Sequence, residues 1–99
     1  MFYKKGHYYI AYGYENEGYQ YPDSTYQGKN DFTDYKIALQ VAKDEHKLEL
    51  DFQKEENGRT KKDEVMNTYV IYIDPDDGYE YEMAIISGWK SKVTEYEYE

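Results

Sequence analysis

The sequence predicts a single α+β domain over residues 1–99, in which one long helix packs on a small antiparallel sheet in the order β(β)-α-β-β-β. Three observations predict this class. Runs rich in Tyr, Ile and Val stand toward both ends of the chain, helical periodicity is confined to the middle, and turn residues separate the runs. A chain of 99 residues also suits one domain of about 12–13 Å radius of gyration.

The first element is a hairpin. Residues 8–14 are dense in aromatic and β-branched residues and predict a strand, which the polar run at 15–18 ends. Residues 19–21 resume the alternation and predict the second arm. Residues 22–32 contain Pro, Asp, Ser, Gly and Asn, and therefore predict a loop.

A helix is predicted over residues 34–57. Asp31 or Thr33 can cap it, with Asp34 in the first turn, and Asn57-Gly58 supplies a left-handed end. Residues 47–53 leave one alternative open, because their apolar residues also alternate as in a strand. When plotted at 100° per residue, one broad apolar stripe contains Ile37, Ala38, Val41, Ala42, Leu48 and Phe52. Leu39 and Leu50 fall on the opposite face, which would need a second covering surface.

The C-terminal third predicts three strands. A charged connector at 59–64 leads to a strand at 65–73, and residues 74–78 form an Asp-Pro-Asp-Asp-Gly turn in which Pro presets φ and Gly accepts positive φ. Residues 79–86 form the returning strand. Residues 89–98 predict the last one.

The composition argues for a folded protein. Only 16 residues are Leu, Ile, Val or Phe, and the net charge is −9, a combination typical of disorder. The 15 tyrosines reverse this conclusion, because each ring buries a large apolar area at low entropic cost. The absence of cysteine excludes disulfides and Cys-based zinc sites. No apolar run suits a signal peptide or a membrane span, so we expect a soluble, cytoplasmic protein.

Motifs for catalysis or for metal and cofactor binding are weak. The acidic turn resembles a calcium loop, but Ala84 stands where that motif needs glutamate, so a plain turn is favoured and no metal or cofactor is expected. No motif links His7 or His46 to a nucleophile. We expect His7 to be a strand residue and His46 a polar residue on the helix flank. Nothing selects two catalytic carboxylates among 21 acidic residues, so the sequence predicts a protein that is not an enzyme.

The basic residues form two small groups. Lys4 and Lys5 are one, and Arg59, Lys61 and Lys62 are the other. Tyrosines on a sheet resemble the platforms that stack bases or sugars, but the flanking glutamates disfavour direct binding to nucleic acid or to an anionic membrane. These basic groups leave open a weaker alternative, a pocket that sequesters a nucleotide signal.

The acidic residues are arranged. Residues 65–99 contain eight acids and two bases, and glutamates alternate with tyrosines in both of the last two predicted strands. Like positions on a strand recur every ~6.8 Å, close to the step between phosphates along a nucleic-acid strand. Glutamates on a solvent-facing edge strand are also ordinary protection against edge pairing. The predicted partner-binding residues are the acids Asp76, Asp77, Glu80, Glu82, Glu95, Glu97 and Glu99 and the tyrosines Tyr79, Tyr81, Tyr96 and Tyr98.

A short, cysteine-free chain rich in Tyr and Glu, with one helix on a small sheet, resembles the small acidic inhibitors encoded by bacteriophages, among them anti-CRISPR proteins and anti-restriction or glycosylase-inhibiting DNA mimics. The resemblance implies a non-enzymatic inhibitor that binds the basic nucleic-acid-binding groove of a host nuclease or other defence enzyme in the host cytoplasm. The alternative is a structural or assembly protein that self-associates, for example as a homodimer, through a tyrosine-rich sheet face and an edge at Leu39 and Leu50.

Overall fold

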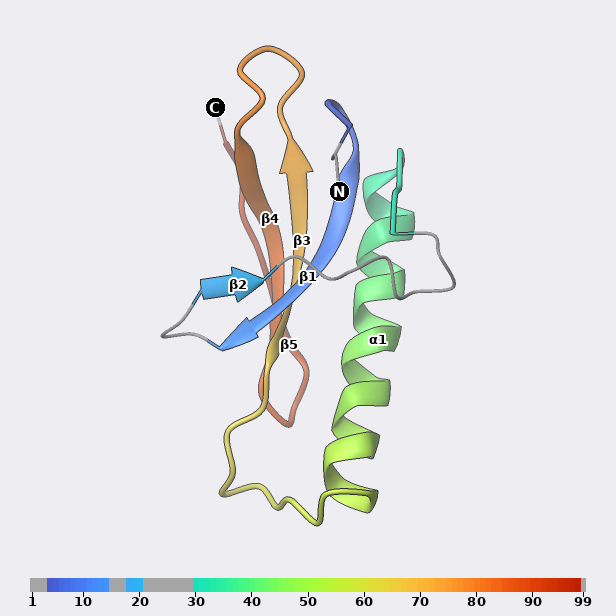
Figure 1. Cartoon of the computed structure of the whole chain (residues 1–99), viewed down its shortest axis with the longest axis vertical. Helices are drawn as coiled ribbons and strands as arrows, with labels where there is room; N and C mark the ends of the chain where they lie inside the picture. The colour runs from blue at the N-terminus through green and yellow to red at the C-terminus, as the bar shows by residue number, and fades with distance from the viewer. Residues whose placement is uncertain (1–3, 15–17, 21–29, 99) are drawn as a thin grey trace.

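The computed structural model describes residues 4–14, 18–20 and 30–98. In these residues the helix α1 and five strands follow the chain in the order β1-β2-α1-β3-β4-β5, and all neighbouring strands pair antiparallel in one sheet of spatial order β2-β1-β3-β4-β5 (Figure 1). The mixed α+β class with one helix and an antiparallel sheet is therefore confirmed. The elements are β1 (Tyr8–Tyr14), β2 (Gly18–Gln20), α1 (Tyr35–Glu55), β3 (Asn67–Ile73), β4 (Glu80–Ser87) and β5 (Lys92–Glu95).

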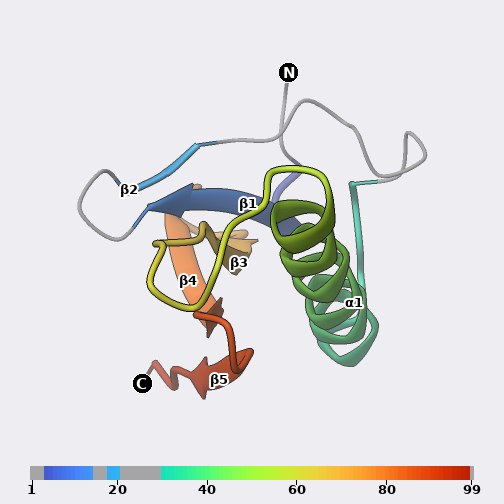
Figure 2. The same ribbon diagram turned by 90° about the horizontal axis from the view of Figure 1, so that it is seen from below.

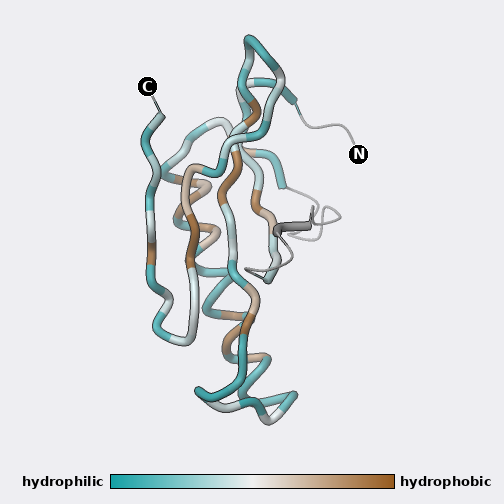
Figure 3. Tube along the Cα trace, turned by 90° about the vertical axis from the view of Figure 1, so that its left-hand side faces the viewer, coloured by the Kyte–Doolittle hydropathy of each residue, from teal (hydrophilic) through white to brown (hydrophobic). Residues whose placement is uncertain are grey.

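The helix covers one face of the sheet (Figure 2). Alternate residues of the strands consequently enter two different clusters. The strands contain short apolar stretches, coloured brown in Figure 3. Ala38 and Ala42 bring α1 close to the sheet, where they are fully buried. The cluster under the helix contains Ile10, Val70, Ala84 and Ile86 with these two alanines, and the buried cluster on the other face contains Tyr9, Ala11, Tyr69, Ile71 and Ile73.

Two residues of the predicted loop, Asn30 and Phe32, bond to the outer edge of β1. The buried side chain of Asn30 accepts from the amide of Ile10 at 2.8 Å and donates to its carbonyl at 2.9 Å, as a neighbouring strand would. Phe32 exchanges two backbone hydrogen bonds with Tyr8. The predicted strand residue Tyr21 and loop residues 22–29 lie outside the described residues.

The ends of α1 correct one detail of the sequence analysis. Asp34 is the N-cap itself, and its carboxylate accepts from the amides of Lys36 and Ile37, so neither Asp31 nor Thr33 caps the helix. Gly58 has a φ of +64°, as a left-handed end requires. Residues 47–53 are helical, which makes the strand alternative wrong. Among the described residues, no helix is long and apolar enough to cross a membrane.

The buried face of α1 agrees with the predicted stripe at Ala38 and Ala42 and differs from it elsewhere. It contains Ala38, Ala42, His46 and Leu50. Three residues of the predicted stripe are instead largely exposed: Ile37 at 57%, Leu48 at 61% and Phe52 at 50%. The stripe gave weight to large apolar side chains, but close packing on the sheet selects two alanines. Leu39 packs partly buried against the cluster under the helix and Leu50 is buried, so these two residues do not form an exposed edge.

The second hairpin is confirmed. Gly78 has a φ of +73° in the turn that joins β3 to β4. The pairing of these strands shifts register between Val70 and Ile71, since Val70 pairs with Ala84 and Ile71 with Glu82. Met83 is thus the extra residue of a β-bulge. The last strand is shorter than predicted, because Trp89 lies in the β4–β5 turn and residues 96–98 are not in a strand.

Candidate functional site

The predicted row of carboxylates is divided between the two faces of the sheet. Glu80 and Glu82 pair with Ile73 and Ile71 and so share the face away from the helix, because directly opposed residues of antiparallel strands lie on one face. Glu95 pairs with Ala84, which lies under the helix. Glu80 and Glu82 therefore do not share a face with Glu95. Glu99 lies outside the described residues.

The β-bulge at Met83 causes this division. Without an extra residue, Glu80 and Glu82 would continue the face of Ala84, and hence of its partner Glu95, because side chains alternate with a period of two. The bulge moves the residues before it to the opposite face. Nothing in the Tyr-Glu alternation of this segment indicates a bulge.

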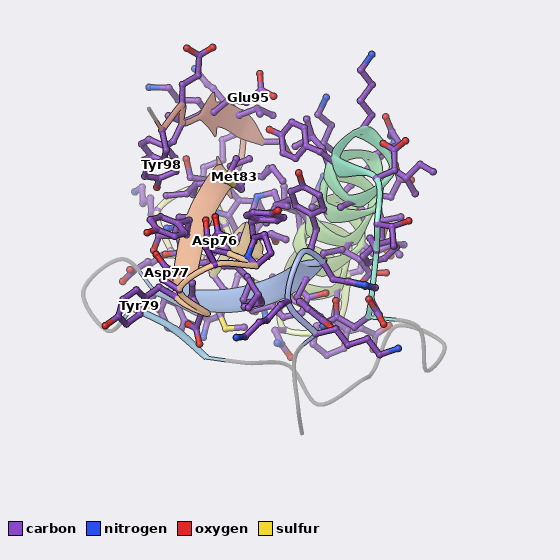
Figure 4. The ribbon with its side chains drawn as sticks, turned by 90° about the horizontal axis from the view of Figure 1, so that it is seen from above. Asp76, Asp77, Tyr79, Met83, Glu95 and Tyr98 are labelled. Atoms are coloured by element: carbon purple, nitrogen blue, oxygen red, sulfur yellow. The ribbon has the colours of Figure 1, made fainter. Side chains whose placement is uncertain are left out.

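The β3–β4 turn fixes its own carboxylates. Asp74 accepts from the backbone amides of Asp76 and Asp77 at 2.7 and 3.1 Å. Asp77 accepts from the amide of Tyr79 at 2.8 Å and from the hydroxyl of Tyr81 at 2.9 Å, and the latter bond raises the pKa of Tyr81. In the described residues no three acidic or histidine side chains are grouped so as to hold a metal ion. Asp76 and Asp77 are exposed at this turn (Figure 4).

Tyrosines form a row across the helix-facing side of the sheet near this turn. Tyr8 lies opposite Tyr72, with ring centroids 4.7 Å apart, and Tyr72 lies opposite Tyr81. Tyr35 of α1 extends the row at one end, at 5.6 Å from Tyr8. Tyr98 extends it at the other, at 5.1 Å from Tyr81 in an edge-to-face contact. Tyr8, Tyr35 and Tyr72 were not among the predicted site residues, because their approach depends on strand pairing and helix packing.

The last residues are held against this row. Tyr98 donates through its hydroxyl to the carbonyl of Glu82 at 2.7 Å, and Tyr96 donates through its amide to the carbonyl of Met83 at 2.9 Å. Tyr35 donates to the carboxylate of Glu95 at 2.7 Å, so burial together with this bond raises the pKa of Tyr35. These contacts enclose a pocket of about 480 Å³ lined by Tyr35, Met83, Glu95, Tyr96, Glu97 and Tyr98.

Glu82 is the least exposed of the predicted carboxylates. It lines a hollow of about 390 Å³ on the face away from the helix, together with Tyr69, Ile85 and Tyr96. Burial among these groups raises the pKa of Glu82. Tyr79 and Glu80 lie around the turn and are exposed, Tyr79 at 69%. Figure 4 shows Glu95 on β5 well separated from Asp77 and Tyr79 at the turn.

The two histidines lie in different surroundings from those expected. His7 precedes β1 and bonds to Asp31, which also contacts Lys4. His46 is not on the helix flank but fully buried, with Nε2 2.9 Å from the carbonyl of Gly88 and Nδ1 3.0 Å from the hydroxyl of Thr68. In the described residues neither ring is hydrogen-bonded to a serine.

The tyrosine-rich face proposed for self-association is mostly internal. Tyr9 and Tyr69 are 3% and 4% exposed. The tyrosines with large exposed rings in the described residues are Tyr79, Tyr96 and Tyr98, all near the acidic turn or the C-terminal segment. Comparison of the chain with protein-family models, with curated proteins and with solved structures finds no match.

Proposed function

We propose that this protein is a non-enzymatic inhibitor that inserts the edge formed by β4, β5 and the β3–β4 turn into the basic groove of a nucleic-acid-binding protein, such as a defence nuclease. The observation that carries the proposal is the presence, along this one edge, of exposed carboxylates and exposed tyrosines on a framework of short hydrogen bonds. We call it the acidic edge, and it contains Asp76, Asp77, Tyr79, Glu80, Tyr81, Glu82, Glu95, Tyr96, Glu97 and Tyr98.

Order in the acidic edge supports binding with little loss of conformational entropy. Asp74 and Asp77 fix the turn, and the hydroxyl of Tyr81 on β4 donates to Asp77. The hydroxyl of Tyr98 donates to the carbonyl of Glu82 and so holds the C-terminal segment against β4. Preorganised groups bind more tightly because less freedom is lost on association.

The combination of side chains suits a charge-led encounter followed by aromatic contact. Carboxylates steer the approach to a basic surface and raise the association rate at low ionic strength. Tyr79, Tyr96 and Tyr98 are 69%, 40% and 52% exposed, and tyrosine is enriched among residues that dominate interface affinity. Of the nearby cations, Lys4 contacts Asp31, while the Lys5 side chain lies against Gly78.

The division of the carboxylates determines the mode of contact. A single acidic face would lie flat on a basic surface. The acidic edge instead carries Glu80 and Glu82 on one side and Glu95 on the other, so it suits a groove with two basic walls. Such a groove is what a protein that encloses a nucleic-acid strand provides.

A displacement assay tests the proposal. Labelled duplex DNA or single-stranded RNA is bound to each member of a panel of purified nucleases, and the protein is added at low and at high salt. We expect displacement from at least one nuclease, weakening steeply with salt. The variant Asp76→Lys/Glu97→Lys should lose at least about tenfold in affinity, because two ammonium groups that repel the basic groove replace two carboxylates that attract it.

The matched control is Glu55→Lys/Glu56→Lys, which makes the same change in net charge at the far end of α1. It should displace the nucleic acid as well as the unmodified protein does. Equal losses in both variants would show that net charge alone is responsible. Displacement that does not depend on salt, or none from any nuclease at low salt, would contradict the proposal.

A further inference from the structure

A second site lies at the end of the molecule opposite the acidic turn. The C-terminal part of α1, the connector that follows it and the β4–β5 turn meet there (Figures 1 and 2). They enclose a pocket of about 750 Å³, within the ~300–1,000 Å³ range of small-molecule sites. We call it the basic pocket; its lining residues used below are Lys47, Lys54, Arg59, Lys61, Asp51 and Trp89.

The basic pocket concentrates positive charge in a protein of net charge −9. Four of its lining residues are cations and one is an acid. Although many carboxylates lie on α1 and the connector, none comes within 4 Å of these four cations in the part of the chain that the structure describes. Four cations against one carboxylate leave the lining of the cavity with a net positive charge, which attracts an anionic ligand.

Arg59 is positioned to present part of its guanidinium. Its amide donates to the carbonyl of Gln53 at 2.9 Å, and one terminal nitrogen donates to the carbonyl of Glu64 at 2.9 Å. The remaining guanidinium donors have no partner among the described residues. A planar fork held in this way matches the oxygens of a phosphate.

Trp89 provides a fixed aromatic wall. Its indole nitrogen donates to the carbonyl of Asp63 at 2.8 Å, which ties the β4–β5 turn to the connector. The adjacent carbonyl of Gly88 accepts from buried His46 of α1 at 2.9 Å. Because both the connector and α1 hold this turn, the indole is preorganised as a surface on which a flat ring can stack.

We propose that the basic pocket binds a nucleotide, whose base stacks on Trp89 and whose phosphates contact Lys47, Lys54, Arg59 and Lys61. The single carboxylate, Asp51, suits an amino group of a base or a ribose hydroxyl. A free nucleotide fits better than a nucleic-acid strand, because a long polyanion would extend beyond the pocket over a surface of net negative charge. The site is separate from the acidic edge and does not rest on the function proposed for it.

Trp89 is the sole tryptophan of the chain, so its fluorescence reports on this site. The full-length protein is titrated with adenosine and guanosine mono-, di- and triphosphates, with inorganic triphosphate and with the nucleosides. We expect at least one nucleotide to change the fluorescence with a dissociation constant below about 1 mM. Inorganic triphosphate and the nucleosides should each bind at least about tenfold more weakly. Inorganic triphosphate has no base to stack on Trp89, and the nucleosides have no phosphates to contact the cations.

The variant Lys47→Gln/Lys54→Gln should weaken nucleotide binding at least about tenfold in calorimetry. Its matched control is Lys36→Gln/Lys43→Gln, which removes two exposed lysines of the same helix that do not line the pocket, and should leave binding unchanged. Trp89→Ala should weaken binding roughly tenfold.

Three results would overturn the proposal. Equal binding of inorganic triphosphate and nucleotide would reduce the site to an anion site, and tighter binding of single-stranded oligonucleotides would make it a nucleic-acid site. If no nucleotide binds at millimolar concentration, the cations serve only to offset the partial negative charge at the C-terminal end of α1. None of these results bears on displacement by the acidic edge, so the two proposals fail independently.

Discussion

His46 and Thr68 are hydrogen-bonded in the interior, with Nδ1 3.0 Å from Oγ1, and both side chains are fully buried. A carbonyl only accepts, so Nε2 of His46 carries the proton donated to Gly88, and Nδ1 pairs with the hydroxyl of Thr68. This one side chain links α1 to β3 and to the turn that carries Trp89.

Thr68→Val should therefore lower the free energy of unfolding by about 1–3 kcal/mol, because it leaves a buried ring nitrogen without a hydrogen-bond partner while preserving volume. Urea denaturation measures the change. Thr94→Val on β5 is the control, and its effect should stay within about 0.5 kcal/mol. Similar costs for the two variants would show that the bond does not stabilise the fold.

Asp34→Ala should destabilise the protein by about 1 kcal/mol, because the amides at the start of α1 lose their acceptor. Thermal unfolding followed by far-UV circular dichroism measures this loss. Thr33→Ala, one residue earlier, should be nearly neutral. A larger effect at Thr33 than at Asp34 would show that Thr33, and not Asp34, caps the helix.

Asp31→Asn should destabilise the protein at neutral pH and lose this effect in acid. Burial acts to raise the pKa of Asp31, but the hydrogen bonds and charges of His7 and Lys4 outweigh it and hold the pKa below its ordinary value. A carboxyl with a lowered folded pKa contributes stability above the unfolded pKa, and this is lost as pH falls through the folded value.

Urea unfolding of wild type and Asp31→Asn from pH 7 to pH 3 should show the two curves converging. Asp76→Asn, at an exposed position of the turn, is the control and should follow wild type throughout. A gap that is constant with pH would mean that shape, and not charge, accounts for the effect of Asp31.

Glu82→Gln should stabilise the protein at neutral pH, in contrast to Asp31→Asn. Burial raises the pKa of Glu82, so its charged form destabilises the fold at pH 7, and the amide should be the more stable variant there. As pH falls through the raised folded pKa, the wild-type carboxyl takes up its proton and the advantage of the amide disappears. The same urea series measures it, with exposed Glu97→Gln as the control. A variant less stable than wild type at pH 7 would show that the carboxylate is favourably bound.

Local chemistry accounts for the parts of the fold that could be predicted from the sequence. Aromatic and β-branched runs indicated β1, β3 and β4, and Pro75 and Gly78 indicated the turn between the last two. The buried face of α1 could be predicted only in part, since the predicted stripe included Ala38 and Ala42 but neither His46 nor Leu50. Which side of an amphipathic helix is covered depends on how closely the sheet approaches, and Ala38 and Ala42 permit an approach that larger residues would prevent.

The candidate sites were harder to predict because they combine distant segments. Arg59 and Lys61 were recognised as a basic group, but Lys47, Lys54 and Trp89 join them only once the connector and the β4–β5 turn meet. Tyr35 meets Glu95 across 60 residues for the same reason.

The sequence by itself determined that the chain is strongly acidic, that tyrosine supplies much of its buriable surface, and that one helix stands among antiparallel strands. These properties are sums over residues or patterns within short windows. The tertiary structure alone decided which carboxylates share a face. One extra residue, Met83, at a bulge between paired strands places Glu80 and Glu82 on the other face of the sheet from Glu95. Side chains alternate between the two faces along a strand, so a shift of one residue reverses all of them.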